Sequence, residues 1–452
     1  MNDFNDTIAS ISTPPGEGGI GIIRISGDKS LEILNEIFTR EIKNPNIFTY
    51  GHIKDNDKVI DEVMAVYMKN PHSYTREDVV EIQCHGGIVP LRNILELVIK
   101  KGARLAEKGE FTKRAFLNGR LDLTQAEAVI DLIKAKSSKT FDVSMSQLEG
   151  KFSRKIGEIR KVLLDSLVNL TVNIDYPDED IEELTYEKLN CDMVESMRLI
   201  DNILKTSDTG RILNEGLKVS IIGKPNVGKS SLMNALLNTE RAIVTEIPGT
   251  TRDTIEEGII IRGIPINLID TAGIRETSDV IERIGIEKSK EAFNTSDLIL
   301  FLIDSSREIT DEDLEIAELV KDRTSLLIVN KIDLDRKADI SKLKLDDIKK
   351  IEVSLINDEG LESIKDEIEN LVYSGDVKQE DSVLLTNVRH KALLDCAKKS
   401  ICDAMTLIDL REPLEVIEID VNNAYTLLGE ITGESVSDDI IDEVFKRFCL
   451  GK

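Results

Sequence analysis

Several kinds of residue are scarce in this chain of 452 residues, and each scarcity excludes something. Tryptophan is absent and aromatic residues make up 4%, so few side chains can stack on nucleic-acid bases. The five cysteines form no Cys-x-x-Cys pair, which favours reduced thiols over a disulfide framework. No run approaches the about 20 apolar residues of a membrane span, and the polar start lacks the features of a secretory signal. We expect a cytoplasmic protein without a membrane segment.

Positive charge is also in short supply. The net charge is −26, and residues 1–120 carry 16 Lys and Arg against 17 Asp and Glu, so nearly all of the excess negative charge lies in residues 121–452. A surface this acidic repels phosphate backbones. If the protein acts on nucleic acid, a local basic patch or a partner protein has to supply the attraction.

Length and residue pattern predict a multidomain chain with an α+β part and an α/β part. At about 100–200 residues per domain, there is room for two to four domains. Residues 1–120 mix short strands, at 7–11 and 21–25, with turns and a helix at 93–101, as in a small α+β domain. Residues 121–215 are poor in glycine and carry apolar residues at helical spacing.

The third segment, residues 216–375, alternates apolar strands with helical stretches, which is typical of a parallel sheet with helices on both faces. Residues 376–452 return to helix, most clearly at 391–407 and 436–448. We therefore expect one discontinuous helical domain interrupted by a nucleotide-binding domain. The strands expected in this insert are 218–222, 266–269, 298–303 and 326–329.

A phosphate-binding loop follows the first strand of the insert. Residues 223–230 match Gly-x-x-x-x-Gly-Lys-Ser between a strand and a helical pattern. In such a loop the backbone N–H groups face the phosphates, Lys229 reaches the β and γ oxygens, and Ser230 offers its hydroxyl to Mg²⁺. The nucleotide-binding residues expected here are Asn226, Val227, Gly228, Lys229, Ser230 and Ser231.

Two further motifs follow later strands. The Asp-Thr-Ala-Gly motif at 270–273 places a carboxylate near the metal and a glycine near the γ-phosphate. The Asn-Lys-Ile-Asp motif at 330–333 ends in a carboxylate that can accept hydrogen bonds from N1 and N2 of guanine, which adenine cannot supply. Together with the loop, they predict a GTP-hydrolysing enzyme. The expected binding residues are Asp270, Thr271, Ala272, Gly273, Asn330, Lys331 and Asp333.

A polar segment between these motifs reads Pro-Gly-Thr-Thr-Arg-Asp at 248–253. GTPases keep the loop that senses the γ-phosphate in this place. A threonine there completes the Mg²⁺ shell, and we assign Thr251, with Thr250 as the alternative. The expected nucleotide- or metal-binding residues are Thr245, Glu246, Ile247, Pro248, Gly249, Thr250 and Thr251.

Motifs along the whole chain point to one family. In the nucleotide-binding insert they include Asp-Thr-Ala-Gly-Ile-Arg-Glu from 270 and Ile-Glu-Arg-Ile-Gly from 281. Towards the N-terminus they include Ser-Tyr-Thr-Arg-Glu-Asp from 73, Cys-His-Gly-Gly from 84 and Gly-Glu-Phe-Thr-Lys-Arg from 109, and the chain ends in Phe-Cys-Leu-Gly-Lys. With these motifs the sequence resembles the bacterial tRNA-modification GTPase family, MnmE/TrmE, from end to end.

The resemblance implies an N-terminal domain (1–120) that dimerises and binds a tetrahydrofolate, a helical domain in two parts (121–215 and 376–452), and an inserted Ras-like G domain (216–375). It implies a homodimer that acts with the FAD-dependent partner MnmG in a heterotetramer. Together they install an aminomethyl or carboxymethylaminomethyl group on carbon 5 of the wobble uridine of certain tRNAs. The one-carbon unit comes from 5-formyl- or 5,10-methylenetetrahydrofolate, and the amine comes from glycine or ammonium.

The resemblance also implies residue roles in GTP hydrolysis. In this family the residue at Asn226 coordinates K⁺ together with oxygens at Thr245, Ile247 and Thr250. A cation there neutralises charge that develops in the transition state, where other GTPases place an arginine finger. The family's carboxylate at Glu282 orients the attacking water, directly or through another water.

The folate contacts of the family map to Arg24, Glu81, Arg120 and Lys452. Glu81 can accept hydrogen bonds from the pterin ring, and the cations can pair with carboxylates or carbonyl groups. Without the family, Arg24 and Glu81 would be interpreted as a surface salt bridge. Cys449 admits two interpretations: a catalytic thiol, or a small buried residue that places Lys452.

One departure and two alternatives accompany this interpretation. GTPases of this type carry Ser-Ala-Lys behind the guanine, and here residues 351–356 (Ile-Glu-Val-Ser-Leu-Ile) stand in its place. A ribosome-assembly or RNA-binding switch GTPase is the first alternative, but it predicts a basic appendage after residue 375, where the chain is acidic. A folate-binding scaffold with a dispensable G domain is the second, and it would not need Glu282 or Thr251.

Overall fold

The computed structural model of the chain describes residues 6–14, 16–176, 186–239, 256–269, 293–373, 383–449 and 451–452. Contacts divide the chain into two compact units. The first unit comprises Met1–Ile130, Gln147–Met193 and Lys399–Lys452, and the second comprises Asp131–Ser146 and Val194–Lys398. Within the described part of the chain, no helix is both long enough and apolar enough to cross a membrane.

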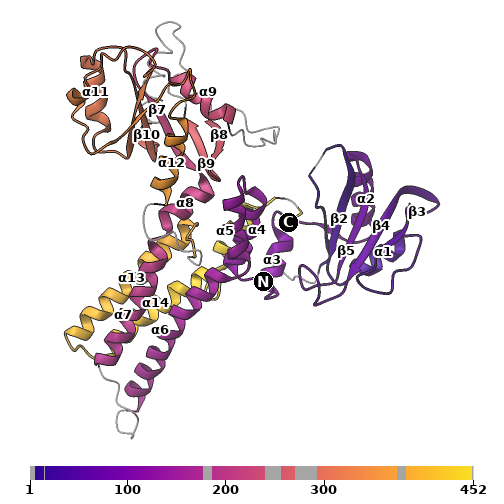
Figure 1. Cartoon of the computed structure of the whole chain (residues 1–452). Helices are drawn as coiled ribbons and strands as arrows, with labels where there is room; N and C mark the ends of the chain where they lie inside the picture. Colours follow the sequence, from indigo (N-terminus) through magenta and orange to yellow (C-terminus); the bar gives the residue numbers. More distant parts are fainter. Residues whose placement is uncertain are drawn as a thin grey trace, which may run out of the picture. The chain divides into compact units, whose positions relative to one another are not determined.

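A six-stranded sheet organises the N-terminal part of the first unit, with the strand order β3-β4-β5-β2-β1-β6. All neighbours are antiparallel except β1 and β6. Two helices pack on this sheet through a shared apolar core (Figure 1). The elements are β1 (Ile8–Ile11), β2 (Gly18–Ser26), α1 (Ser30–Ile37), β3 (Thr49–Asp55), β4 (Lys58–Met68), β5 (Val79–Gly86), α2 (Ile88–Lys100) and β6 (Arg104–Leu105).

The expected α+β character of this segment is confirmed, with one helix longer than expected. Helix α2 begins at Ile88 rather than at residue 93. The start is hard to see in the sequence because Gly86, Gly87 and Pro90 surround it, yet proline is tolerated in the first turn, where its missing N–H has no helical partner.

Helices complete the first unit. They include α3 (Glu110–Leu117), α4 (Leu123–Lys134), α6 (Lys151–Asp175), α14 (Leu414–Thr432) and α15 (Asp438–Lys446), and α14 packs along α6. An apolar cluster joins α3, α4 and α15 through Phe116, Leu123 and Phe445. It anchors the chain's end, which returns to β1, where the Ser12 hydroxyl donates to the carbonyl of Gly451 at 3.3 Å.

The second unit contains the expected α/β insert. Its sheet has the order β12-β11-β10-β7-β9-β8 and is parallel except for β8. The four strands anticipated at 218–222, 266–269, 298–303 and 326–329 are present, and helices α9, α11 and α12 flank them (Figure 1). The strands are β7 (Leu217–Ile222), β8 (Glu256–Ile261), β9 (Ile264–Ile269), β10 (Leu298–Asp304), β11 (Ser325–Asn330) and β12 (Lys349–Glu352), and the helices are α9 (Lys229–Thr239), α11 (Asp311–Val320) and α12 (Leu361–Val372).

The two outer strands, β8 and β12, were not anticipated. Both are edge strands, and β12 reads Lys-Lys-Ile-Glu with only Ile351 buried. Strand β12 lacks the apolar run that marks the central strands, where β10 is buried along its whole length. Strand β8 has such a run, at 259–261, but only in its second half, after Glu-Glu-Gly. The remaining elements are α8 (Ser207–Glu215) and the 3₁₀ helix η1 (Ile340–Leu343) in the second unit, and α5 (Ser138–Leu148), α7 (Tyr186–Leu204) and α13 (Val388–Asp409), which, like α4, contribute residues to both units.

Candidate functional site

The phosphate-binding loop connects β7 to α9, as its sequence predicts. Gly223 and Gly228 have φ angles of +148° and +110°. A Cβ atom would lie 2.3 Å from the carbonyl oxygen of Leu302 at Gly223, and 2.3 Å from the side-chain nitrogen of Asn330 at Gly228. Only glycine fits these two positions, so the loop backbone can approach the strand ends closely and remain open to a ligand.

Lys229 already lies over this loop. Its ammonium donates to the carbonyl oxygens of Gly223 at 2.7 Å and Lys224 at 2.9 Å. Ser230 is exposed at the start of α9. A helix start with a lysine and a free hydroxyl fits a Mg²⁺-bound nucleoside triphosphate, because the backbone N–H groups and the ammonium attract the phosphates.

The Asn-Lys-Ile-Asp motif is tied to the same loop. Asn330, at the end of β11, is buried, and its amide donates to the carbonyl of Val227 at 2.8 Å. Lys331 adopts a left-handed φ of +64°, and its ammonium donates to the carbonyl of Asn226 at 3.0 Å. The predicted phosphate and base motifs are thus brought together, although about one hundred residues separate them in sequence.

Asp333 has a partner that the sequence reasoning missed. The hydroxyl of Ser354 is fully buried and donates to a carboxylate oxygen of Asp333 at 2.6 Å. The segment 351–356, which stands in place of Ser-Ala-Lys, therefore supplies a serine to the carboxylate that we expect to recognise guanine, although it lacks the Ala-Lys that normally follows.

Asp304, at the end of β10, is the second residue that the sequence reasoning missed. It is 5% exposed and accepts from Lys331 Nζ at 2.6 Å and from the Ser306 hydroxyl at 2.6 Å. Burial by itself raises the pKa of Asp304, but these hydrogen bonds outweigh it and hold the pKa below the usual value. The signal that could have identified Asp304 is an acidic residue at the end of an apolar run, which also marks Asp270 in the sequence.

Replacing Asp304 with Asn should therefore weaken nucleotide binding. The change keeps the side chain's size but removes the charge that holds Lys331 against Asn226. We expect KM for GTP to rise about 10-fold, or about 1.4 kcal/mol, with kcat changed little. Steady-state hydrolysis checks this, and Arg307→Gln is the matched control, because Arg307 contacts the same carboxylate at 3.2 Å but is half exposed. An unchanged KM in Asp304→Asn would contradict the role.

Several predicted nucleotide-site residues lie outside the described part of the chain. Strand β9 ends at Ile269, which pairs with Ser220 on β7. Since β7 leads into the phosphate loop, the end of β9 lies beside the strand that precedes this loop. The undescribed residues are Thr245, Glu246, Ile247, Pro248, Gly249, Thr250, Thr251, Asp270, Thr271, Ala272, Gly273 and Glu282.

A second cluster surrounds Tyr74 in the first unit. Arg24 and Glu81, opposite each other on β2 and β5, form an ion pair at 2.9 Å. The guanidinium of Arg24 lies 5.5 Å from the Tyr74 ring centroid, and that of Arg120 lies 4.7 Å from it. Three of the predicted folate contacts thus gather around one aromatic ring, which the sequence reasoning had not singled out.

The C-terminal tail reaches the strand next to Arg24. Gly451 has a φ of +86°, and a Cβ atom there would lie 2.2 Å from the carbonyl oxygen of Ile11 on β1. Since β1 pairs with β2 at Ser10 and Arg24, Gly451 lies beside the strand next to the one that carries Arg24. Cys449 is exposed, and its carbonyl accepts from the Gly109 N–H at 3.4 Å. The exposed thiol does not fit the interpretation of Cys449 as a buried spacer.

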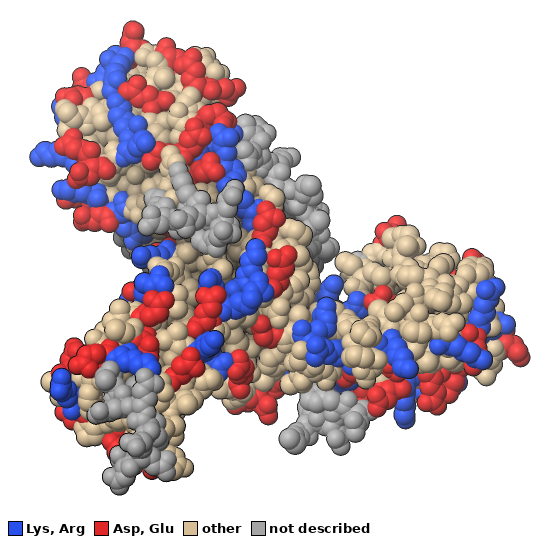
Figure 2. Space-filling view, turned by 60° about the horizontal axis from the view of Figure 1, so that its bottom comes forward, with Lys and Arg blue, Asp and Glu red and all other residues tan. Residues whose placement is uncertain are grey.

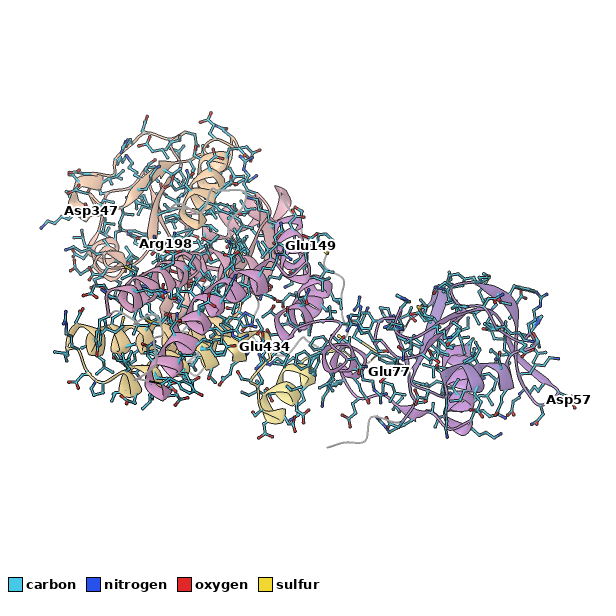
Figure 3. The ribbon with its side chains drawn as sticks, turned by 90° about the horizontal axis from the view of Figure 1, so that it is seen from below. Asp57, Glu77, Glu149, Arg198, Asp347 and Glu434 are labelled. Atoms are coloured by element: carbon cyan, nitrogen blue, oxygen red, sulfur yellow. The ribbon has the colours of Figure 1, made fainter. Side chains whose placement is uncertain are left out.

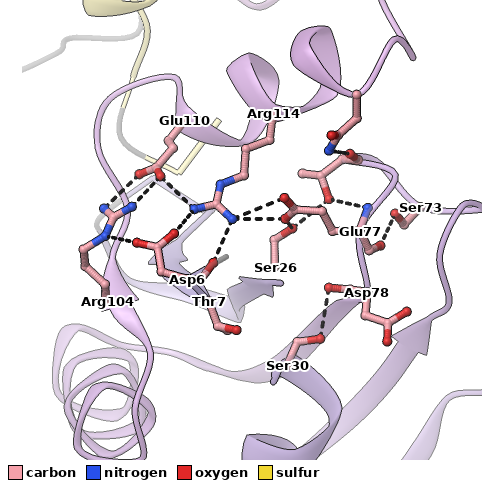
Figure 4. Close-up of polar contacts among 12 residues, drawn as sticks. Asp6, Thr7, Ser26, Ser30, Ser73, Glu77, Asp78, Arg104, Glu110 and Arg114 are labelled. Atoms are coloured by element: carbon pink, nitrogen blue, oxygen red, sulfur yellow. Dashed lines mark hydrogen bonds and ion pairs between the residues drawn. The ribbon is translucent and has the colours of Figure 1, made fainter. Parts of the chain in front are cut away.

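A buried network of ion pairs is centred on Arg114 (Figure 4). Arg114 on α3 is 1% exposed and pairs with Asp6 at 2.6 Å, Glu110 at 3.0 Å and Glu77 at 3.2 Å. Burial raises the pKa of Glu110, but hydrogen bonds from Arg104, the Glu107 N–H and Arg114 bring it below the usual value. The network joins α3 to the segment that carries Tyr74.

Comparisons with known proteins agree with this geometry. A family model described as the MnmE helical domain matches residues 123–449, and one described as the GTP-binding protein TrmE N-terminus matches residues 7–120. The tRNA modification GTPase MnmE of Alkaliphilus oremlandii is 53% identical over 99% of this chain and 100% of its own length, and that of Clostridioides difficile is 49% identical over 99% and 100%.

Among solved structures, Aquifex aeolicus Era bound to GDP and aluminium fluoride is 29% identical over 40% of this chain and 65% of its own, with a TM-score of 0.29. The full-length relatives and the two family models decide the assignment. The chain belongs to the tRNA modification GTPase MnmE family.

Proposed function

We propose that this protein is a potassium-dependent GTPase that, with an MnmG-type FAD-dependent partner, modifies carbon 5 of the wobble uridine of tRNA with a folate-derived one-carbon unit. GTP hydrolysis and a part in tRNA modification follow from the family. The observation that carries the catalytic proposal is the phosphate loop itself, in which Lys331 and Asn330 fix the carbonyls of Asn226 and Val227.

The nucleotide site is proposed to work as follows. Lys229 and the loop N–H groups hold the phosphates, Ser230 and Thr251 hold Mg²⁺, and Asp270 lies beside the metal. Asn226 adopts a left-handed φ of +63° and is exposed, which leaves its amide oxygen free to face a cation. Thr245, Ile247 and Thr250 would complete the K⁺ site, and Glu282 would orient the attacking water. K⁺ supplies positive charge where the transition state becomes more negative.

The folate is proposed to bind at the Tyr74 cluster. Arg24 and Arg120 are cations close to an aromatic ring, and Glu81 is a carboxylate held by Arg24, a donor set that suits a pterin with a glutamate tail. Lys452 would add a cation from the tail, and Cys449 remains a candidate thiol.

The same proposal covers assembly and domains. The N-terminal domain (1–120) would form the homodimer, and two copies would join MnmG in a heterotetramer in the cytoplasm. The helical domain would comprise 121–215 and 376–452, and the G domain 216–375.

The test is GTP hydrolysis by the full-length protein in KCl and in NaCl at equal ionic strength. We expect hydrolysis at least about 10-fold faster in KCl, because a correctly placed charge in the transition state is worth more than ~1.4 kcal/mol. Asn226→Ala should abolish the difference while retaining nucleotide binding. Equal rates in both salts for the unaltered protein would reject the potassium site and leave an ordinary GTPase.

A further inference from the structure

The first three turns of α6 concentrate positive charge in an acidic chain. Residues 151–161 contain five Lys and Arg and one carboxylate, Glu158, whereas the whole chain carries −26. On the face that Figure 2 displays, acidic side chains are interspersed with basic ones. A run of this kind contrasts with the net negative charge of the chain and calls for a physical reason.

Four of the five cations point to solvent. Phe152, Ile156 and Ile159 form the buried side of the helix. The fifth cation, Arg160, is 12% exposed, pairs with Glu434 at 2.5 Å and lies over the Tyr425 ring, so it belongs to the packing against α14. Figure 3 labels its partner Glu434. The exposed cations, which we call the basic face of α6, are Lys151, Arg154, Lys155 and Lys161.

Few carboxylates neutralise the basic face. Lys155 pairs with Glu158 at 2.9 Å, and Lys151 lies 4.0 Å from Glu149. Arg154 donates to the backbone carbonyl of Glu149, which carries no net charge. Counting described residues only, neither Arg154 nor Lys161 has a carboxylate within ion-pair distance. These two cations remain available to an external anion.

The placement costs the fold stability rather than adding to it. The N-terminus of a helix carries partial positive charge, and cations in its first turn, such as Lys151 and Arg154, are placed unfavourably against it. Helix α6 has no acidic residue in its first turn, although acids are favoured there. These cations do not stabilise the helix. Together with the positive end of the helix dipole, they favour the binding of phosphates.

We propose that the basic face of α6 is a docking surface for the phosphate backbone of RNA, and within the proposed function, on which this rests, for the tRNA substrate. It would position the RNA without reading its sequence, because backbone contacts carry no sequence information. No aromatic side chain stands among the four cations, since Phe152 is buried, so the face lacks a platform for base stacking.

The experiment measures binding of a tRNA transcript to full-length protein by fluorescence anisotropy at several KCl concentrations. The variant is Arg154→Ala/Lys161→Ala. Alanine on the solvent side of a helix preserves helix propensity, so the fold should persist. We expect affinity at low salt to fall about 10-fold or more and the slope of log K against log salt to shrink by about one to two. GTP hydrolysis without RNA should not change.

The control is Lys342→Ala/Lys344→Ala, which removes two exposed lysines of the second unit and the same total charge. Equal losses of tRNA affinity in both variants would show that only the net charge of the protein matters, and would overturn the docking surface. Retained tRNA binding by Arg154→Ala/Lys161→Ala would overturn it as well, even if association with a partner protein were lost. If the unaltered protein bound no tRNA, the docking surface and the proposed function would both fail.

Discussion

We expect Asp333→Asn to change the preferred substrate of the enzyme from GTP to xanthosine triphosphate (XTP). In the proposed site the carboxylate accepts hydrogen bonds from N1 and N2 of guanine, and an amide can instead donate to the carbonyl that xanthine has in place of N2. Loss of two hydrogen bonds to a charged group, at about 1.5–3 kcal/mol each, predicts kcat/KM for GTP lower by about 10²–10⁴. Competition between GTP and XTP in steady-state hydrolysis measures the reversal.

The Ser354→Ala variant tests whether Ser354 positions the Asp333 carboxylate without itself selecting the base. The buried hydroxyl donates to Asp333 at 2.6 Å, and its loss leaves the carboxylate charged but less well oriented. We expect a fall of about 10-fold in GTP affinity with no gain for XTP, since one hydrogen bond to a charged acceptor is removed. If Asp333→Asn still preferred GTP, another group would have to select the base, and Ser354 would be the first to examine.

The parts of this site that the sequence predicts are those encoded by neighbouring residues. The phosphate loop and the Asn-Lys-Ile-Asp motif each need a strand, a turn and a few side chains in fixed order, and the structure has both where expected. The central strands were also predicted, because a strand buried on both faces is apolar throughout.

The residues that escaped prediction depend on contacts between distant segments. Ser354 meets Asp333 only because the polar edge strand β12 brings it beside β11. Tyr74 matters because Arg24 and Arg120 lie close to its ring from two other segments. Both residues lie in short motifs of the sequence, but the motifs do not say which distant side chains they contact, so the fold has to be known before these contacts can be identified.

Arg114→Met will cause the largest loss of stability that we predict. The guanidinium is 1% exposed, and its removal leaves the 5%-exposed Glu110 and its neighbour Glu77 without their shared cation. Breaking a buried ion pair on one side costs about 3–5 kcal/mol. Hydrogen exchange of the full-length protein, followed at β1 and α3, reports this locally. Arg104→Met is the control: Arg104 shares Asp6 and Glu110 but is 44% exposed, so about 1 kcal/mol is expected.

The acid dependence distinguishes charge from packing in this network. The pKa values of Asp6 and Glu110 are lowered in the folded protein, so their contribution to stability is present above the usual carboxyl pKa and is lost as the pH falls through the folded values. In Arg114→Met the same carboxylates keep Arg104, which is the larger cause of their lowered pKa values, but lose Arg114, which is the second cation that lowers them. The stability difference between the two proteins should therefore be greatest near neutral pH and narrow below about pH 4. A difference that stays constant as the pH falls well below about 4 would show that Arg114 acts through its packing alone.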